Sequence, residues 1–181
     1  MRRWRAAAGV LAPVAFVTSW VVAGALRDGY DPLHDAISRL AELGAPRRWI
    51  VTAGMVVFGL GALAFAPLLR SRATLALSAA GLASFAVAGL PCTEGCPGSG
   101  AVSDQLHGWA AALFYVAFAL TPALHSKRGI ALALASGMAL GLHGTGVGPN
   151  GALQRAGLTL LDAWMALTAL RAFSESREMV T

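Results

Sequence analysis

One carboxylic acid lies in the middle of a long apolar segment near the end of the chain. Asp162 is about halfway between Arg155 and Arg171, two residues before Trp164. An acid at the centre of a membrane span costs about 2.5–3.5 kcal/mol to insert and normally faces the interior of a helix bundle. Because a neutral carboxylic acid in an apolar pocket can donate a proton, we expect Asp162 to be a catalytic acid.

The alternatives for Asp162 are structural. Its carboxyl group would hydrogen-bond to Thr159, Ser84 or His143, or pair with Arg155 two turns earlier on the same helix face. Two aromatic side chains belong to the same hypothesis, because ring faces stabilise cations. We expect Trp164 and Trp109 to contact a substrate, although packing and an interfacial position explain such residues equally well.

An acid and two histidines are candidates for proton transfer. Asp104 and His107 are three residues apart, so on a helix they share a face. An acid beside an imidazole orients its tautomer and raises its basicity. His143 ends the next apolar segment, which places both imidazoles at the same end of antiparallel helices. The alternative is that Asp104 caps a helix and His107 lies at the membrane interface.

A short outer helix is predicted at residues 32–43. Asp31 is a suitable N-cap, Pro32 fits the first helical position and Gly44 fits the residue after the end. Two interpretations remain open, an amphipathic helix on the membrane surface and a lid over the bundle. In the lid, Asp35 would be catalytic.

The lid would also bind substrate through His34 and Glu42. His34, His107 and His143 are the ligands if a metal is present, since zinc uses histidine and carboxylate ligands. The sequence lacks a helix with two histidines and a glutamate at metal-binding spacing, so we expect no cofactor, with zinc as the alternative. Cys92 and Cys96 are predicted to form a disulfide, which stabilises a loop this small by less than about 3 kcal/mol.

The elements that position these residues are apolar helices. Of 181 residues, 56% are hydrophobic and 13% are charged, whereas a soluble domain carries about 25% charged residues. The sequence predicts a single all-α domain, an integral membrane bundle of about six transmembrane helices with the outer helix. The predicted spans are residues 6–26, 49–69, 73–90, 108–124, 129–146 and 153–170.

The net charge of +5 does not indicate nucleic-acid binding, because the basic residues lie at the ends of apolar segments. Their bias predicts a multi-pass protein of the cell membrane with both termini in the cytoplasm. His125, beside Lys127 and Arg128 on the cytoplasmic side, is expected to have no role. The residues that set this orientation are Arg2, Arg3, Arg5, Arg70, Arg72, Lys127, Arg128, Arg171 and Arg177.

Two motifs resemble a known family. The segment Tyr30-Asp31-Pro32-Leu33-His34-Asp35-Ala36-Ile37-Ser38-Arg39-Leu40 follows the first span, and Pro91-Cys92 with Gly95-Cys96-Pro97 precedes His107-Gly108. Together they resemble the family catalogued as domain of unknown function 998. The resemblance implies a multi-span bacterial membrane protein and no particular activity. One departure is that Thr93, not an acid, follows the first cysteine, and Glu94 comes next.

These observations lead to three functional hypotheses. The first is a small membrane-embedded enzyme that uses buried acid/base residues on a lipid-like or isoprenoid substrate, for example in a proton-initiated cyclisation or isomerisation. The second is a metal-dependent membrane hydrolase. The third is a non-catalytic protein that binds a partner or carries a small solute or proton. The expected partners are membrane lipids and a hydrophobic small molecule, and the hypotheses are compatible with an oligomer.

Overall fold

The computed structural model describes residues 2–93 and 101–178, with side chains described as far as residue 175. These residues form helices and turns, and no strand occurs among them. The α-helices are α1 (Arg2–Ala25), α2 (Trp49–Phe65), α3 (Ser71–Gly89), α4 (Val102–His125), α5 (Gly129–Gly144) and α6 (Asn150–Glu178), and the short 3₁₀ helices are η1 (Ile37–Leu40) and η2 (Ala66–Leu68).

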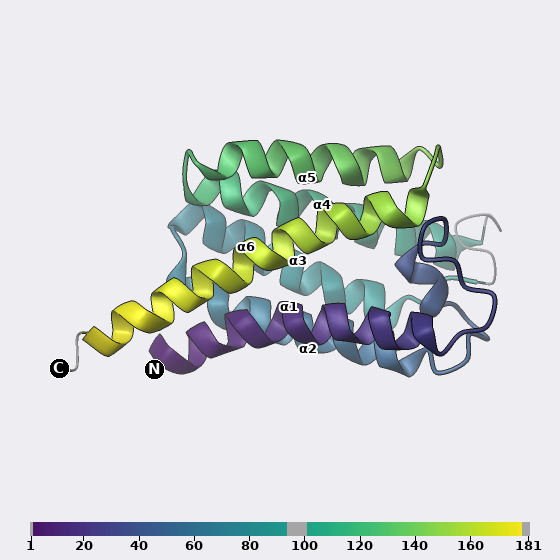
Figure 1. Cartoon of the computed structure of the whole chain (residues 1–181), viewed down its shortest axis with the longest axis horizontal. Coiled ribbons are helices and arrows are strands. Elements are labelled where there is room, and N and C mark those ends of the chain that lie inside the picture. Colours follow the sequence, from purple (N-terminus) through teal and green to yellow (C-terminus); the bar gives the residue numbers. More distant parts are fainter. Residues whose placement is uncertain (1, 94–100, 179–181) are drawn as a thin grey trace.

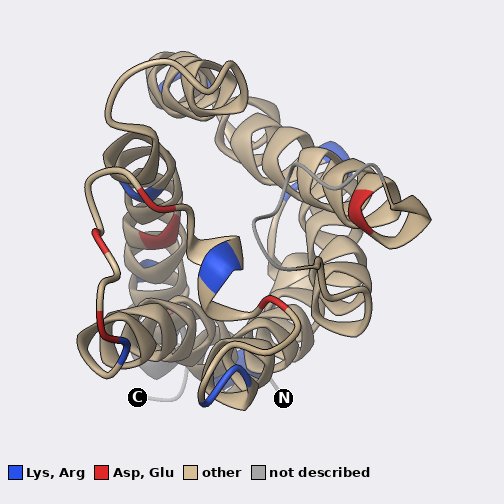
Figure 2. Cartoon of the chain, turned by 90° about the vertical axis from the view of Figure 1, so that its right-hand side faces the viewer, with Lys and Arg blue, Asp and Glu red and all other residues tan. Residues whose placement is uncertain are grey.

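The six α-helices form a closed up-and-down ring in chain order. Each helix packs on the next, and α6 returns to pack on α1. Both ends of the chain lie at the left of the bundle in Figure 1, which we call the termini end. The segment of residues 26–48, here called the cap, lies at the opposite end, the cap end. Figure 2 looks onto that end and shows the cap crossing the middle of the ring of helices.

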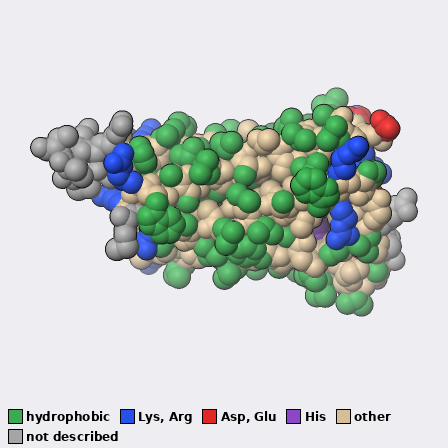
Figure 3. Space-filling model, turned by 90° about the horizontal axis from the view of Figure 1, so that it is seen from below, with side chains coloured by type: hydrophobic (Ala, Val, Ile, Leu, Met, Phe, Trp, Pro, Cys, Tyr) green, Lys and Arg blue, Asp and Glu red, His purple; other side chains and the backbone are tan. Residues whose placement is uncertain are grey.

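Five of the helices are long and apolar enough to cross a membrane, which confirms a multi-pass membrane protein. The sixth, α5, is apolar but has only 16 residues, a length of about 24 Å against a hydrocarbon core of about 30 Å. Hydrophobic side chains run along the whole face shown in Figure 3, with Lys and Arg side chains near its two ends. Such a surface is typical of helices in contact with lipid tails.

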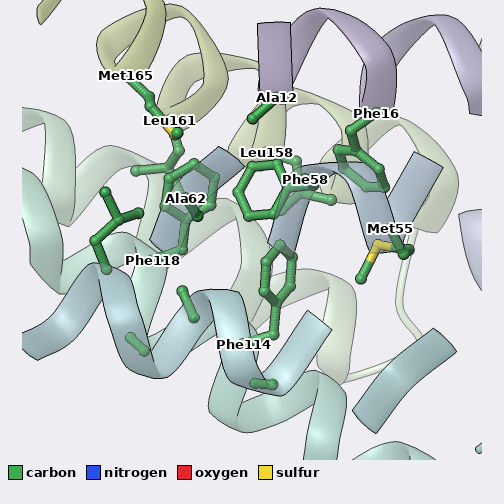
Figure 4. Close-up of a cluster of buried hydrophobic side chains, with 14 of the residues drawn as sticks. Ala12, Phe16, Met55, Phe58, Ala62, Phe114, Phe118, Leu158, Leu161 and Met165 are labelled. Atoms are coloured by element: carbon green, nitrogen blue, oxygen red, sulfur yellow. The ribbon is translucent and has the colours of Figure 1, made fainter. Parts of the chain in front are cut away.

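The centre of the bundle is a cluster of phenylalanine rings. Phe58 packs edge-to-face with three other rings, at centroid distances of 5.7 Å to Phe16, 5.4 Å to Phe114 and 5.1 Å to Phe118. Figure 4 shows Leu161 of α6 beside this cluster. Aromatic pairs in this geometry contribute about 0.5–1.5 kcal/mol beyond their buried area. The cluster therefore joins α1, α2, α4 and α6 at mid-height.

The predicted outer helix at residues 32–43 is wrong in extent. Residues 32–35 are turns, Ala36 is extended with ψ 152°, and only Ile37–Leu40 is helical, in a 3₁₀ turn. The reason is that side chains from other helices bind the backbone groups that an α-helix would use. As described below, those side chains are Arg155 and Gln154 of α6, and their distance in the sequence hides them from any local pattern.

Candidate functional site

Arg155 of α6 holds the first half of the cap. Its Nη1 donates to the carbonyl oxygens of Pro32 at 2.8 Å and Asp35 at 2.9 Å, and its Nη2 donates to the Tyr30 hydroxyl. The guanidinium also lies 5.4 Å from the centroid of the Tyr30 ring and 5.3 Å from that of Trp20. Burial raises the pKa of the Tyr30 phenol, and Arg155 partly opposes this rise. In place of the alternative pair with Asp162, Arg155 therefore binds the cap.

Two ion pairs fix the rest of the cap. Arg27 donates to Glu42 Oε1 at 2.6 Å, and the Glu42 side chain is only 2% exposed. The same guanidinium donates to the carbonyl oxygen of Arg39, whose own guanidinium pairs with Asp35. The two carboxylates expected to act in a lid, those of Asp35 and Glu42, are thus each paired with a different arginine.

A polar chain links the cap to the helices below it. The Ile37 backbone N–H donates to Gln154 Oε1 at 2.7 Å, and Gln154 Nε2 donates to the Tyr115 hydroxyl at 2.5 Å. The Tyr115 ring packs edge-to-face on His143, whose Nδ1 donates to the Asn150 carbonyl oxygen at 3.0 Å. His143 therefore joins α5 to the start of α6.

A cavity of about 40 Å³ lies under the cap, and we call it the cap cavity. Its walls are mostly apolar, with polar groups from Ser38, Thr52, His107, Tyr115 and Gln154. A water molecule needs roughly 10–15 Å³ of such space, so this cavity has room for a few waters and not for a lipid chain.

Asp104 and His107 each bind the segment that follows α3. The carboxylate of Asp104 accepts two hydrogen bonds at 2.7 Å from Thr93, one from the backbone N–H and one from the hydroxyl. His107 Nδ1 donates to the Leu90 carbonyl oxygen at 2.6 Å. Both side chains are buried. The prediction that Asp104 and His107 lie on one helix is correct. The two side chains bind different backbone groups, the Thr93 N–H for Asp104 and the Leu90 carbonyl oxygen for His107.

His34 is far more exposed than the other two candidate histidines. Its Nδ1 lies 2.6 Å from Asp31 Oδ2, with both side chains more than half exposed. The hydrogen bond from His34 lowers the pKa of the Asp31 carboxyl. Within residues 2–93 and 101–175, no three His, Cys, Asp or Glu side chains gather closely enough to hold a metal ion. His34, His107 and His143 are therefore not a ligand set in this structure.

Asp162 is buried at mid-helix, and neither of its carboxyl oxygens has a hydrogen-bond partner in the described part of the chain. Its direction follows from the register of α6. A Cβ atom added to Gly9 of α1 would lie 2.8 Å from the Cβ atom of Ala169, so Ala169 faces α1. The guanidinium of Arg155 lies over the ring of Trp20, also in α1. Since Asp162 is seven residues from each, two helical turns, it also faces α1. It lines neither of the two cavities described here.

Two further predicted sites are the Cys92–Cys96 pair and Trp109. Neither Cys92 nor Trp109 lines the cap cavity. Cys92 is buried and its carbonyl oxygen accepts a hydrogen bond from Leu43 at 2.8 Å, which ties the cap to the end of α3. Cys96 lies outside the described residues, so the Cys92–Cys96 disulfide stays a prediction. The Trp109 side chain is 75% exposed on the outer surface of α4, which suits an interfacial position.

A much larger cavity, of about 830 Å³, opens at the termini end, and we call it the basic cavity. Its wall is built from the start of α1, the η2–α3 junction, the α4–α5 turn and the last turns of α6. Five cations line it, and they come from all four of these places: Arg2, Arg70, Lys127, Arg128 and Arg171.

The inner wall of the basic cavity is apolar and aromatic. Leu68, Leu132 and Trp164 line it and are half-buried, whereas Arg70 and Arg171 are exposed at its mouth. The ring of His125 packs edge-to-face on Trp164 at a centroid distance of 5.8 Å. His125, expected to have no role, thus lines the cavity, and Trp164 faces this cavity rather than a site around Asp162.

Among the described residues that line this cavity, Glu175 is the only one with a carboxylate. It accepts a hydrogen bond from Arg2 Nη2 at 3.2 Å, so one of the five cations is paired within the cavity. An open cavity with an excess of arginine and lysine and an apolar floor suits an anion that carries an apolar chain. Sequence reasoning missed this site because its cations belong to separate chain segments, each of which resembles an ordinary topology signal.

Comparisons with known proteins give a family and no closer relative. The model of the family described as "Protein of unknown function (DUF998)" matches residues 10–171. No curated protein and no solved structure matches the chain. The match covers all six helices at least in part, the cap, the cap cavity and the basic cavity except for Arg2, Ala172 and Glu175. The chain belongs to the DUF998 family.

Proposed function

We propose that this protein binds a lipid-like amphiphile with an anionic head group at the basic cavity. The observation that carries the proposal is the convergence of Arg70, Lys127, Arg128 and Arg171 on one cavity with an apolar inner wall. Basic pockets between transmembrane helices are suited to anionic lipid head groups. Arginine adds planar, bidentate hydrogen bonding to phosphate oxygens, which a scattered positive charge does not provide.

The proposed orientation places both termini in the cytoplasm of a cell whose membrane holds the bundle. The termini end carries the basic cavity, and four acids lie in the cap, Asp28, Asp31, Asp35 and Glu42. An excess of Lys and Arg marks cytoplasmic loops. The basic cavity then faces the leaflet surface that anionic lipids make negative, which raises the local concentration of its ligand.

This proposal keeps the lipid-like class of ligand expected from the sequence. The binding place moves from the predicted acid/base residues to the basic cavity. The predicted acid/base residues have separate surroundings: Asp104 and His107 bind backbone groups, and Asp162 lies apart from both cavities. At the basic cavity the neutral polar side chains are those of His125, Ser126 and Thr168. These groups would orient a head group that the cations attract.

Thermal unfolding of the purified protein in a neutral detergent tests the proposal. Added phosphatidylglycerol is expected to raise the unfolding midpoint, and added phosphatidylcholine is expected to leave it unchanged, because a ligand stabilises the state that binds it. Arg70→Gln is expected to remove most of the rise. Arg72→Gln is the matched control, since Arg72 is two residues away, exposed and not part of the cavity wall. Equal shifts for both lipids, or equal losses in both variants, would contradict the proposal.

A further inference from the structure

Among the described side chains, the positive charge at the basic cavity exceeds what a singly charged lipid can neutralise. Arg2 has a partner in Glu175 at 3.2 Å. Within residues 2–93 and 101–175, no carboxylate pairs with the other four cations, Arg70, Lys127, Arg128 and Arg171. A phosphodiester carries one negative charge, so three of the four cations would remain uncompensated in its complex.

The donors are also arranged for an anion with many oxygens. Arg70, Arg128 and Arg171 line the cavity from the start of α3, the α4–α5 turn and α6, which are separate parts of its wall. Each guanidinium matches two oxygens in a fork. A phosphodiester has two non-bridging oxygens and one negative charge to share among these guanidinium groups, whereas a terminal phosphate or a diphosphate offers three or more oxygens and at least two charges.

The shape of the cavity leaves room for part of an apolar chain. Its volume of about 830 Å³ is in the usual range for pockets that hold a whole small ligand. The cations lie around the mouth, and Leu132 and Trp164 lie deeper, within the apolar parts of α5 and α6. A ligand with its charge at one end and a chain at the other matches this division.

Resting on the proposed function, we infer that the ligand of the basic cavity carries a terminal phosphate or a diphosphate, with two or more negative charges, on an apolar chain. The head group lies among Arg70, Lys127 and Arg171, and the first carbons of the chain lie against Trp164. Lipids with a single phosphodiester charge bind at the same place but more weakly.

A set of amphiphiles with one chain and different head groups tests the inference by calorimetry. The probes are methyl dodecyl phosphate, dodecyl phosphate and dodecyl diphosphate, above the second phosphate pKa of about 6. Dodecyl phosphate is expected to bind about tenfold more tightly than the methyl ester, and the diphosphate at least as tightly as dodecyl phosphate. Inorganic phosphate and diphosphate, which lack the chain, are expected to bind more weakly than their dodecyl forms.

The outcomes separate this inference from the proposed function. Equal affinity for methyl dodecyl phosphate and dodecyl phosphate overturns the inference and leaves the proposed function standing. No binding by any of the three amphiphiles overturns both. If the inorganic anions bind as tightly as the dodecyl forms, the ligand is a soluble anion and the apolar chain is refuted.

Two variants show whether the charge preference belongs to the cavity. Arg171→Gln is expected to reduce the ratio of affinities between dodecyl phosphate and its methyl ester, because it removes a charge and a fork. Arg72→Gln is expected to preserve that ratio. Both side chains are exposed, so neither variant disturbs the core. An unchanged ratio in Arg171→Gln would refute the assignment of the head group to this cavity.

Discussion

Arg27 and Glu42 form a largely buried ion pair that joins the start of the cap, just after α1, to its second half. Nη2 of Arg27 donates to Oε1 of Glu42 at 2.6 Å, with side chains 17% and 2% exposed. Removing one member of a buried pair leaves the other charge in a poorly solvated place, which costs more than removing both.

Arg27→Met is therefore expected to lower the free energy of unfolding by about 3–5 kcal/mol. The double variant Arg27→Met, Glu42→Met is expected to lose less than Arg27→Met alone. Arg39→Met is the control, because the more exposed Arg39–Asp35 pair is expected to contribute at most about 1 kcal/mol. Denaturant unfolding in detergent measures all three. A double variant less stable than Arg27→Met would contradict this account of the cap.

The first turn of α6 approaches the cap so closely that only glycine fits at position 151. A Cβ there would lie 2.4 Å from the Asp35 carbonyl oxygen and 2.6 Å from that of Pro32, the two oxygens that Arg155 binds. We expect Gly151→Ala to lose about 1–3 kcal/mol and to increase hydrogen exchange in residues 32–36.

Gly141→Ala is the matched control for this substitution. A Cβ on Gly141 meets no atom within 4 Å, and alanine in a helix is favoured over glycine by about 0.5–1 kcal/mol. We expect this variant to be at least as stable as the parent protein. Unchanged stability of Gly151→Ala would show that the cap moves freely relative to α6, against the contacts described above.

The sequence predicts the helices well and the contacts between distant segments poorly. All six predicted spans correspond to helices, and the main error is that α4 and α6 extend beyond the apolar residues into polar ones. Hydropathy does not detect such extensions, because a helix continues through polar residues wherever water or head groups solvate them. An α-helix was predicted in the cap because the capping residues at its two ends are local sequence signals. Arg155 and Gln154, which bind the cap backbone instead, are more than 100 residues away and leave no local signal.

In the candidate site, too, the sequence predicts local features and misses contacts between distant segments. The prediction that Asp162 is buried at mid-helix is confirmed, since it depends only on the apolar sequence around it. The alternatives in which its carboxyl group bonds to Ser84 or His143 required a tertiary arrangement that the described structure does not have. The basic cavity was missed because no single segment contains more than two of its five cations.

Asp162 is expected to reduce the stability of the bundle. An unsatisfied buried polar group costs about 1–3 kcal/mol, and neither carboxyl oxygen has a partner in the described chain. Asp162→Leu is therefore expected to be more stable than the parent protein, and its binding at the basic cavity is expected to be unchanged.

The neighbouring substitution Leu161→Ala is the control for Asp162→Leu. Leu161 is fully buried, so this variant is expected to lose about 2–5 kcal/mol and shows that the unfolding assay detects changes at this depth. If Asp162→Leu and Asp162→Asn both lose stability, the carboxyl group has a structural partner, which contradicts this prediction and supports the hydrogen-bond alternative for Asp162.

The cap is expected to loosen at high pH through Tyr30. Burial raises the pKa of Tyr30 above its ordinary value of 10.0, so the folded cap favours the neutral phenol. The resulting stabilisation is fully present below pH 10 and is lost as the pH rises through the raised value. Tyrosinate absorbance measures this titration, and Tyr30→Phe is expected to remove it together with the pH-dependent part of the cap's stability. Titration of Tyr30 at or below its ordinary pKa would contradict the burial seen in the structure.

The central claim is that the basic cavity holds the phosphate of an amphiphile. An experimental structure of the protein with saturating dodecyl phosphate tests it most directly. The predicted result is phosphate density at the termini end, with oxygens about 3 Å from nitrogens of Arg70, Lys127 or Arg171 and the chain against Trp164. Phosphate density confined to the cap end, or a basic cavity without it, would contradict the account.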